Sequence, residues 1–204
     1  MRMPIPSKFG DPTQAHLGIM RAVSPRFEGV LKGLTVPTPP AFDSERLREE
    51  LLQTMRHTQS PEVGDEFSRA VDADMIPYIC SVAECYGAHA DPDELQELIS
   101  DLVPLILRVK YAFNTPRPWQ LAPAYGLSIR RLASSSAETP AYPSGHAIQA
   151  ATACGLVASR FPHAARQLNR AAEKIGQSRL ELGVHYPIDV LQGLRIGRQI
   201  AERI

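Results

Sequence analysis

The sequence predicts an all-α fold, because apolar residues recur at helical spacing, helix-start signals precede these segments, and no segment alternates as a β-strand would. The start signals are Ser60-Pro61, Asp91-Pro92, Phe161-Pro162 and Tyr186-Pro187, in which proline takes the first helical position. The chain has 204 residues, of which 44% are hydrophobic and 22% charged, so it can bury one sizeable core. We therefore expect one compact all-α domain, or at most two small ones.

The chain divides into an N-terminal arm and a helical domain. Residues 1–42 contain seven prolines and little periodicity, so we expect an irregular arm with one short helix around residues 14–22. Residues 43–204 form the domain, which begins with a helix whose apolar stripe includes Leu47, Leu51 and Met55. The later helices that we expect span residues 60–87 (starting at Ser60-Pro61 and disturbed near Pro77), 92–113, 144–159, 161–182 and 187–200.

Residues 114–143 form a long connection that is rich in proline. A loop of this length inside a small domain is more often functional than idle. We expect its serine run at residues 134–136 to be a flexible loop.

Charge and hydropathy limit the classes of partner. Lys and Arg together number 22, as do Asp and Glu, so the overall charge indicates neither a nucleic-acid nor a membrane-surface partner. No window holds the roughly 18 apolar residues of a membrane span, and the first twenty residues lack a signal peptide's apolar stretch. We expect a soluble, cytoplasmic protein without integral membrane association. Apolar positions on the first helices would make a homo-oligomer unsurprising.

Three short segments carry the residue types that phosphoryl transfer requires. A protein that transfers phosphate without a metal ion needs several fixed positive charges around the equatorial oxygens. Lys110, Arg117 and Arg179 can supply them, the arginines as planar forks and the lysine as a point charge. The segments span residues 110–118, 142–146 and 178–189.

The middle segment adds an anion site made of backbone. Pro-Ser-Gly-His stands where a helix is expected to begin, and a helix N-terminus attracts anions through its free N–H groups. Gly145 lets the backbone approach an oxyanion closely, and Ser144 adds a hydroxyl.

Two histidines could carry the covalent chemistry. His185 and Asp189 are four residues apart, which on a helical turn places them on one face. Asp189 could then accept the Nδ1 proton and leave Nε2 of His185 free to attack phosphorus. His146 would protonate the leaving alcohol and later activate water.

Together the segments resemble the signature of the type 2 phosphatidic acid phosphatase superfamily: Lys-x6-Arg-Pro, Pro-Ser-Gly-His and Ser-Arg-x5-His-x3-Asp, all met without substitution. The resemblance covers about residues 92–200. That superfamily includes bacterial acid phosphatases, membrane lipid phosphatases and vanadium haloperoxidases. The resemblance implies a helical bundle of that type, His185 as nucleophile, His146 as general acid, Asp189 as partner of His185, and the phosphate ligands Lys110, Arg117, Ser144, Gly145 and Arg179.

The sequence thus favours an acid-phosphatase-like hydrolase that cleaves phosphomonoesters or pyrophosphates through a phosphohistidine and requires no cofactor. Vanadate, a phosphate mimic, would be an inhibitor. In the alternative interpretation vanadate is the cofactor of a haloperoxidase, bound by the same residues. We call these phosphate ligands the cage: Lys110, Arg117, Ser144, Gly145 and Arg179. A third class, a non-catalytic phosphate-binding protein, would need the cations but no nucleophile.

The remaining polar residues are interpreted as structural. His16, His57, His89 and His163 match no motif, so we place them at the surface or at helix caps. No histidine pair has the spacing of a metal site. Glu181 is expected to be an exposed helix charge.

Overall fold

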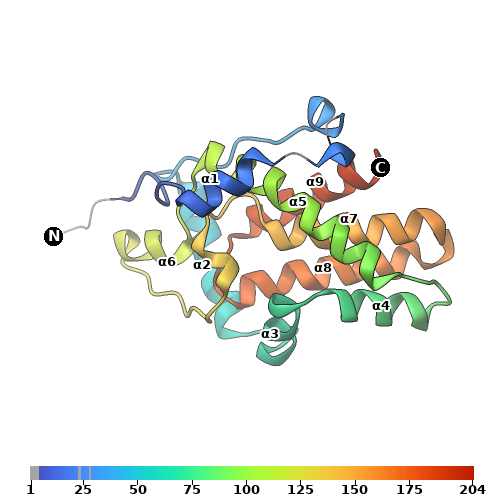
Figure 1. Cartoon of the computed structure of the whole chain (residues 1–204). Helices are drawn as coiled ribbons and strands as arrows, with labels where there is room; N and C mark the ends of the chain where they lie inside the picture. The colour runs from blue at the N-terminus through green and yellow to red at the C-terminus, as the bar shows by residue number, and fades with distance from the viewer. Residues whose placement is uncertain (1–4, 23, 28) are drawn as a thin grey trace.

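The computed structural model describes residues 5–22, 24–27 and 29–204. Within these residues every regular element is helical, and the helices assemble into a bundle (Figure 1). The prediction of an all-α fold is confirmed. The α-helices are α1 (Gln14–Arg21), α2 (Glu45–Gln59), α3 (Asp65–Ala73), α4 (Ile76–Cys85), α5 (Pro92–Phe113), α6 (Pro118–Leu121), α7 (Gly145–Arg160), α8 (Ala165–Glu181) and α9 (Pro187–Ala201).

Most predicted helix starts agree with the structure. The Asp91 carboxylate accepts a hydrogen bond from the N–H of Asp93 at 2.9 Å and caps α5. Ser144 caps α7, and Tyr186 precedes Pro187 at the start of α9. The connection at 114–143 contains only α6 and short 3₁₀ turns at Ala122–Tyr125 and Ser135–Glu138.

The predicted start at Ser60-Pro61 is wrong. Ser60 ends α2, because its N–H donates to the carbonyl of Arg56 at 2.9 Å. The chain then runs as a loop to Gly64, whose φ of 85° suits glycine, and α3 begins at Asp65. Pro77 lies in the first turn of α4, where a missing N–H costs nothing, so it marks the beginning of a separate helix.

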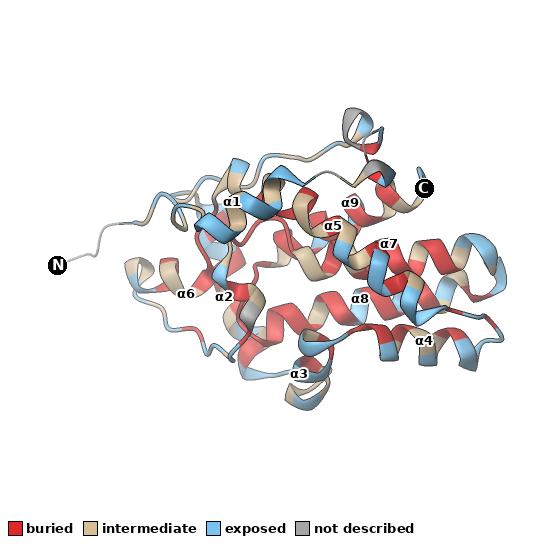
Figure 2. Ribbon diagram, viewed as in Figure 1, coloured by how far each residue is buried: buried red, intermediate tan, exposed pale blue. Residues whose placement is uncertain are grey.

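The core lies where α7 packs between α5, α8 and α9 (Figures 1 and 2). Helix α9 approaches α7 closely because glycines face it. A Cβ at Gly193 would lie 2.6 Å from the carbonyl oxygen of Ser144, and one at Gly197 would lie 2.5 Å from that of Ile148. Neither distance leaves room for a methyl group. Backbone therefore meets backbone along this interface, and the start of α7 is held against α9.

The N-terminal arm lies on the outside of α5. Helix α1 packs on it, and the N–H of Phe9 donates to the carbonyl of Asn114 at 2.8 Å. Helix α2 packs against α8 and α9, and its Leu47 and Leu51 join a second apolar cluster with Leu121 and Tyr186. In the described ranges, no helix combines the length and apolar character that crossing a bilayer requires.

We predict that Gly193→Ala destabilises the fold by about 2 kcal/mol, because overpacking the α7–α9 contact outweighs the better helix propensity of alanine. Urea denaturation would measure the loss. Gly18→Ala in α1 is the matched control, since nothing lies within 4 Å of its added Cβ. Equal stability of the two variants would contradict this packing.

Candidate active site

Arg117 is buried at the start of α6, and every one of its nitrogens is engaged. Nε donates to the carbonyl of Thr139 at 2.7 Å, Nη1 to that of Val184 at 2.6 Å, and Nη2 to that of Ser136 at 2.9 Å. Burial lowers the pKa of Arg117 to about 9, so its guanidinium keeps its charge at neutral pH. The long 114–143 connection thus folds around this side chain.

Lys110, near the end of α5, is held by the same connection. Its Nζ donates to the carbonyls of Pro140 and Ala141 at 2.6 and 3.2 Å. Burial is the main cause that lowers the pKa of Lys110, and the neighbouring Arg117 lowers it further.

Arg179 of α8 is the third buried cation. Its Nη1 donates to Oδ1 of Asp72 at 2.6 Å, and its Nη2 donates to the hydroxyls of Ser134 and Ser136 at 3.1 and 3.0 Å. Its Nε is buried and has no hydrogen-bond partner among the described residues. Two of the three serines in the run interpreted as flexible loop therefore accept hydrogen bonds from an arginine, and that interpretation was wrong.

The Ser144-Gly145 turn places the N-terminus of α7 beside these cations. Ser144 is buried, and its hydroxyl caps α7 by accepting from the N–H of Ala147 at 3.4 Å. A Cβ at Gly145 would lie 3.2 Å from Cγ2 of Ile106 and 3.6 Å from Cε of Lys110. Glycine at this position therefore lets the first turn of α7 lie directly against α5.

The contacts of His185 fix its tautomer. Nη1 of Arg117 lies 3.0 Å from Nε2 of His185, and a guanidinium can only donate, so Nε2 must be the unprotonated nitrogen. Nδ1 then carries the proton and donates to Oδ2 of Asp189 at 3.0 Å. The same Oδ2 accepts from the N–H of Tyr186 at 3.0 Å. His185 lies just before α9 rather than on a helical face, but the predicted contact with Asp189 forms.

The surroundings favour the neutral form of His185. Burial lowers the pKa of His185 well below 6.5, and the positive charges of Arg117 and Lys110 act in the same direction. Burial also raises the pKa of Asp189 to about 7, while the Tyr186 N–H opposes that rise. At neutral pH Nε2 of His185 is thus unprotonated, and its lone pair accepts a hydrogen bond from Arg117.

His146 lies in the first turn of α7. Its Nε2 is 3.4 Å from the backbone oxygen of Asp72 and 3.8 Å from the carboxylate oxygen Oδ1 of that residue. Because the backbone oxygen can only accept, Nε2 carries the proton and Nδ1 is the free nitrogen. Burial lowers the pKa of His146 well below 6.5, and Arg179 adds to this effect.

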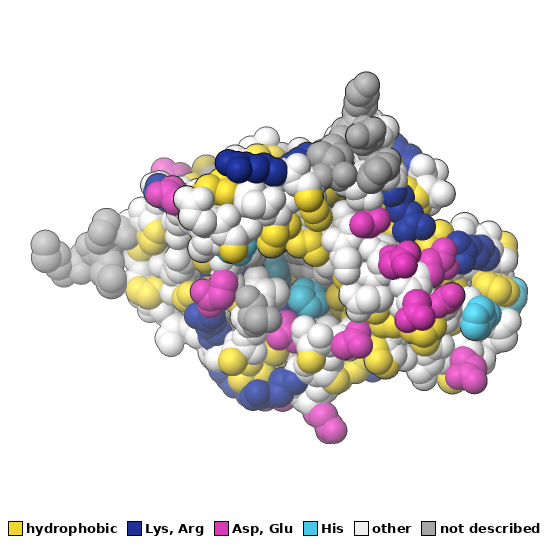
Figure 3. Space-filling view, viewed as in Figure 1, with side chains coloured by type: hydrophobic (Ala, Val, Ile, Leu, Met, Phe, Trp, Pro, Cys, Tyr) yellow, Lys and Arg dark blue, Asp and Glu magenta, His cyan; other side chains and the backbone are white. Residues whose placement is uncertain are grey.

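Both imidazoles open onto one pocket of about 270 Å³. Figure 3 shows a hollow near the centre of this face, with histidine side chains in it and hydrophobic side chains along its edge. Arg117, Ser144, Arg179 and Asp189 are fully buried and do not line it. The residues that line the pocket are His16, Ile19, Val103, Ile106, Leu107, Lys110, Ser136, Thr139, Gly145, His146, Gln149 and His185.

Three residues of the site region were missed or misread in the sequence. Asp72 belongs to α3, a short amphipathic helix with no motif that could have indicated its contact with Arg179. Glu181 is buried rather than exposed, and its carboxylate accepts hydrogen bonds from the N–H groups of residues 62, 63 and 64 at 2.7, 2.9 and 3.1 Å. It thereby fixes the loop that leads into α3. His16, placed at the surface or a cap, lines the pocket.

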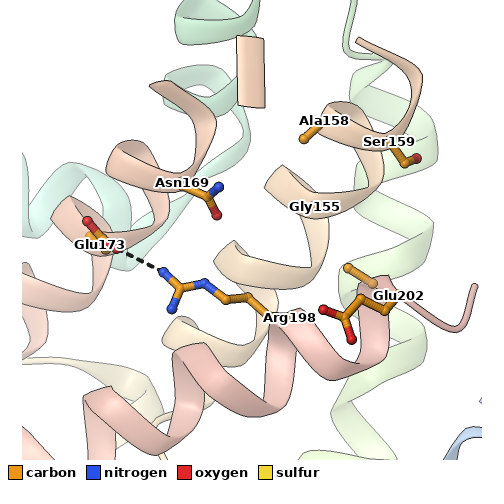
Figure 4. Close-up of a pocket in the computed structure, with 8 residues that line it drawn as sticks. Gly155, Ala158, Ser159, Asn169, Glu173, Arg198 and Glu202 are labelled. Carbon is orange, nitrogen blue, oxygen red and sulfur yellow. Dashed lines mark hydrogen bonds and ion pairs between the residues drawn. The ribbon is translucent and has the colours of Figure 1, made fainter. Parts of the chain in front are cut away.

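A larger hollow of about 520 Å³ lies elsewhere, between α7, α8 and α9. Arg198 and Glu173 form an ion pair across it at 2.8 Å (Figure 4). None of the cage residues lines it, and its described lining includes no histidine or cysteine. It is a surface groove, separate from the pocket that holds the imidazoles.

The geometry can be compared with known proteins. A family model described as the PAP2 superfamily matches residues 96–202, which include every predicted site residue. The chain belongs to the PAP2 superfamily. Among solved structures, a transmembrane PAP2-type phosphatidylglycerolphosphate phosphatase from Bacillus subtilis is similar in fold, with a TM-score of 0.52 and 17% identity over 78% of this chain and 85% of that one. No curated protein matches the sequence.

PAP2 membership confirms the resemblance and supports phosphoester hydrolase activity. Helices α1 to α4 lie outside the residues that the family model matches. Asp72 of α3 therefore supplies a carboxylate to Arg179 from outside the matched segment.

We predict that Asp72→Ala destabilises the protein by about 3 kcal/mol, because it leaves the buried Arg179 without a counter-charge. Inorganic phosphate should raise the melting temperature of this variant more than that of the wild type, because a bound anion replaces the lost carboxylate.

Asp65→Ala is the matched control, since Asp65 lies on the same helix and pairs with Arg130 at an exposed position, where ion pairs contribute little. An equal phosphate-induced shift in Asp72→Ala and in the wild type would contradict the assignment of Arg179 to the anion site.

Proposed function

We propose that this PAP2 protein is a metal-independent phosphatase that hydrolyses phosphomonoesters or pyrophosphates through a phosphohistidine at His185. The observation that carries the proposal is the unprotonated Nε2 of His185, held 3.0 Å from Arg117 in a pocket shared with His146. A nucleophile with its lone pair among fixed cations suits attack on a phosphate dianion.

In the first step, Nε2 of His185 forms a bond to phosphorus while the bond between phosphorus and the ester oxygen breaks. His146, protonated at Nδ1, gives its proton to the departing oxygen, so an alcohol leaves. The Nδ1–H of His185 stays hydrogen-bonded to Asp189, which stabilises the positive charge that develops on the ring. Lys110 and the N-terminus of α7 line the pocket and stabilise the equatorial oxygens directly, whereas the buried charges of Arg117 and Arg179 stabilise them through their positive potential.

In the second step, water attacks phosphorus and the bond from phosphorus to Nε2 breaks. His146, now neutral, takes a proton from the water, and inorganic phosphate leaves. His185 regains its free lone pair, so the atoms and protons balance over the two steps.

His146 must be protonated in the first step although cations lower its pKa in the free protein. A phosphate dianion in the cage offsets the charges of Arg179, Lys110 and Arg117, and a nearby negative charge raises a histidine pKa. Substrate binding would thus bring His146 to the protonation state that cleavage needs.

We predict that His146→Ala accumulates phosphorylated protein, whereas His185→Ala accepts no phosphate. The substrate should be an aryl phosphate, whose leaving group departs without a proton, so that only the second step depends on His146. Intact-mass spectrometry after mixing in the presence of a chelator would detect the added phosphoryl group on the protein.

His163→Ala is the control, because His163 is exposed outside the pocket, and it should turn over as the wild type does. If phosphate never appears on His146→Ala, and the wild type shows none on rapid quenching, the covalent mechanism is wrong.

A second prediction concerns pH. Protonated His185 cannot attack, and its pKa is lowered, so the acid limb of kcat/KM should lie below pH 6.5. Lys110→Met removes a positive charge that disfavours the imidazolium, which raises the pKa of His185 and moves this limb to higher pH.

One aryl phosphate should be used throughout, so that the ionisation of the substrate is the same in every profile. Lys174→Met, at an exposed position of α8, should leave the limb in place. If the acid limb of Lys110→Met moves to lower pH, then the limb does not report the protonation of a nucleophilic His185, and that assignment is contradicted.

A further inference from the structure

One side of the catalytic pocket is apolar, and it is built from two elements. Val103, Ile106 and Leu107 of α5 line it together with Ile19 of α1. The polar lining includes Lys110, His146 and His185 at the cage, together with His16 of α1 and Gln149 of α7. A substrate whose phosphate occupies the cage would therefore place its organic group against the α1–α5 wall.

Helix α1 is fixed to α5 at several points, so this wall is a defined part of the fold. Nδ1 of His16 lies 2.7 Å from the hydroxyl of Tyr111. Arg108 donates to the carbonyl of Met20 at 2.5 Å and to that of Ala22 at 3.2 Å, which holds the end of α1. The side-chain oxygen of Asn114 accepts from the N–H of Gly10 at 3.3 Å, which holds the start of the arm.

The size and chemistry of the pocket restrict the organic group. Its volume of about 270 Å³ is just below the roughly 300–1,000 Å³ of pockets that enclose drug-sized ligands, and the phosphate takes part of it. Hydroxyl-rich groups such as sugars would lose water against the side chains of Ile19, Val103 and Leu107 without gaining hydrogen bonds from them. A short alkyl or aryl group would instead gain from leaving water.

We propose that α1 and α5 form the leaving-group subsite, and that it selects phosphomonoesters whose organic group is short and apolar. This inference rests on the proposed phosphatase function. Helix α1 lies outside the residues that the PAP2 model matches, whereas the wall residues of α5 lie within them.

The test is the rate of hydrolysis of n-alkyl phosphates from methyl to octyl, whose leaving alcohols have similar acidity. In the wild type kcat/KM should rise by about fourfold per methylene, equivalent to about 0.8 kcal/mol, and then level off within a few carbons. Butyl phosphate should exceed glycerol 3-phosphate, which has a similar size, by more than about tenfold on the same scale.

Ile19→Ser and Val103→Thr should each reduce the rise per methylene, because they put a hydroxyl on the apolar wall. Leu191→Ser is the matched control, since Leu191 is an exposed apolar residue of α9 that does not line the pocket. It should keep the wild-type rise.

The possible failures are distinguishable. If glycerol 3-phosphate is hydrolysed as fast as butyl phosphate, or if the rise continues to octyl, the inference is wrong and the phosphatase function stands. If the rise is unchanged in both wall variants, the subsite lies elsewhere. If no ester is hydrolysed, both the inference and the proposed function are overturned.

Discussion

The fold is organised around the burial of two arginines and a lysine. Arg117 and Arg179 have no exposed side-chain surface, and Lys110 is almost as deeply buried. Charges in a protein interior need polar partners, and here they are mostly backbone carbonyls from residues 136–141 and 184 together with two serine hydroxyls. The partners come from a connection that has almost no regular structure of its own, so the cations order this connection. Because most of these partners are neutral groups and few are carboxylates, the electrostatic potential around the three cations stays positive. That potential would stabilise a bound oxyanion.

A second set of contacts joins this centre to helix α3, which lies outside the residues that the family model matches. The carboxylate of Glu181 accepts hydrogen bonds from three N–H groups of the loop before α3. Helix α3 then places Asp72 beside Arg179 and His146. Two residues of α8 are therefore linked through another helix: Glu181 positions the helix that supplies the counter-charge of Arg179. On the opposite side, the arm places α1 beside the pocket. The elements around the cage thus contribute a carboxylate on one side and an apolar wall on the other.

The sequence predicted the centre of the structure better than its surroundings. Helices α5, α7 and α9 were predictable because caps or prolines mark their starts, whereas Pro162 opens a 3₁₀ turn and α8 itself begins at Ala165. The pattern of the site residues is strict enough to indicate that they gather at one site: Lys110, Arg117, Ser144, His146, His185 and Asp189. The start of α3 was missed because three of the N–H groups before it bind Glu181, a tertiary contact that no local signal reveals. Asp72, the serine run and His16 were missed for the same reason. Each acquires its role only when distant segments meet, as when residue 72 reaches residue 179.

The central claim is that His185 is neutral, protonated on Nδ1 and unprotonated on the Nε2 that faces Arg117. Nitrogen-15 NMR of the histidine-labelled protein, with His185 assigned by comparison with His185→Ala, measures this directly. The account predicts the Nδ1–H tautomer at pH 7, with Nε2 showing the shift of an unprotonated imidazole nitrogen and no titration until well below pH 6.5. An Nε2–H tautomer, or an imidazolium at pH 7, would contradict it.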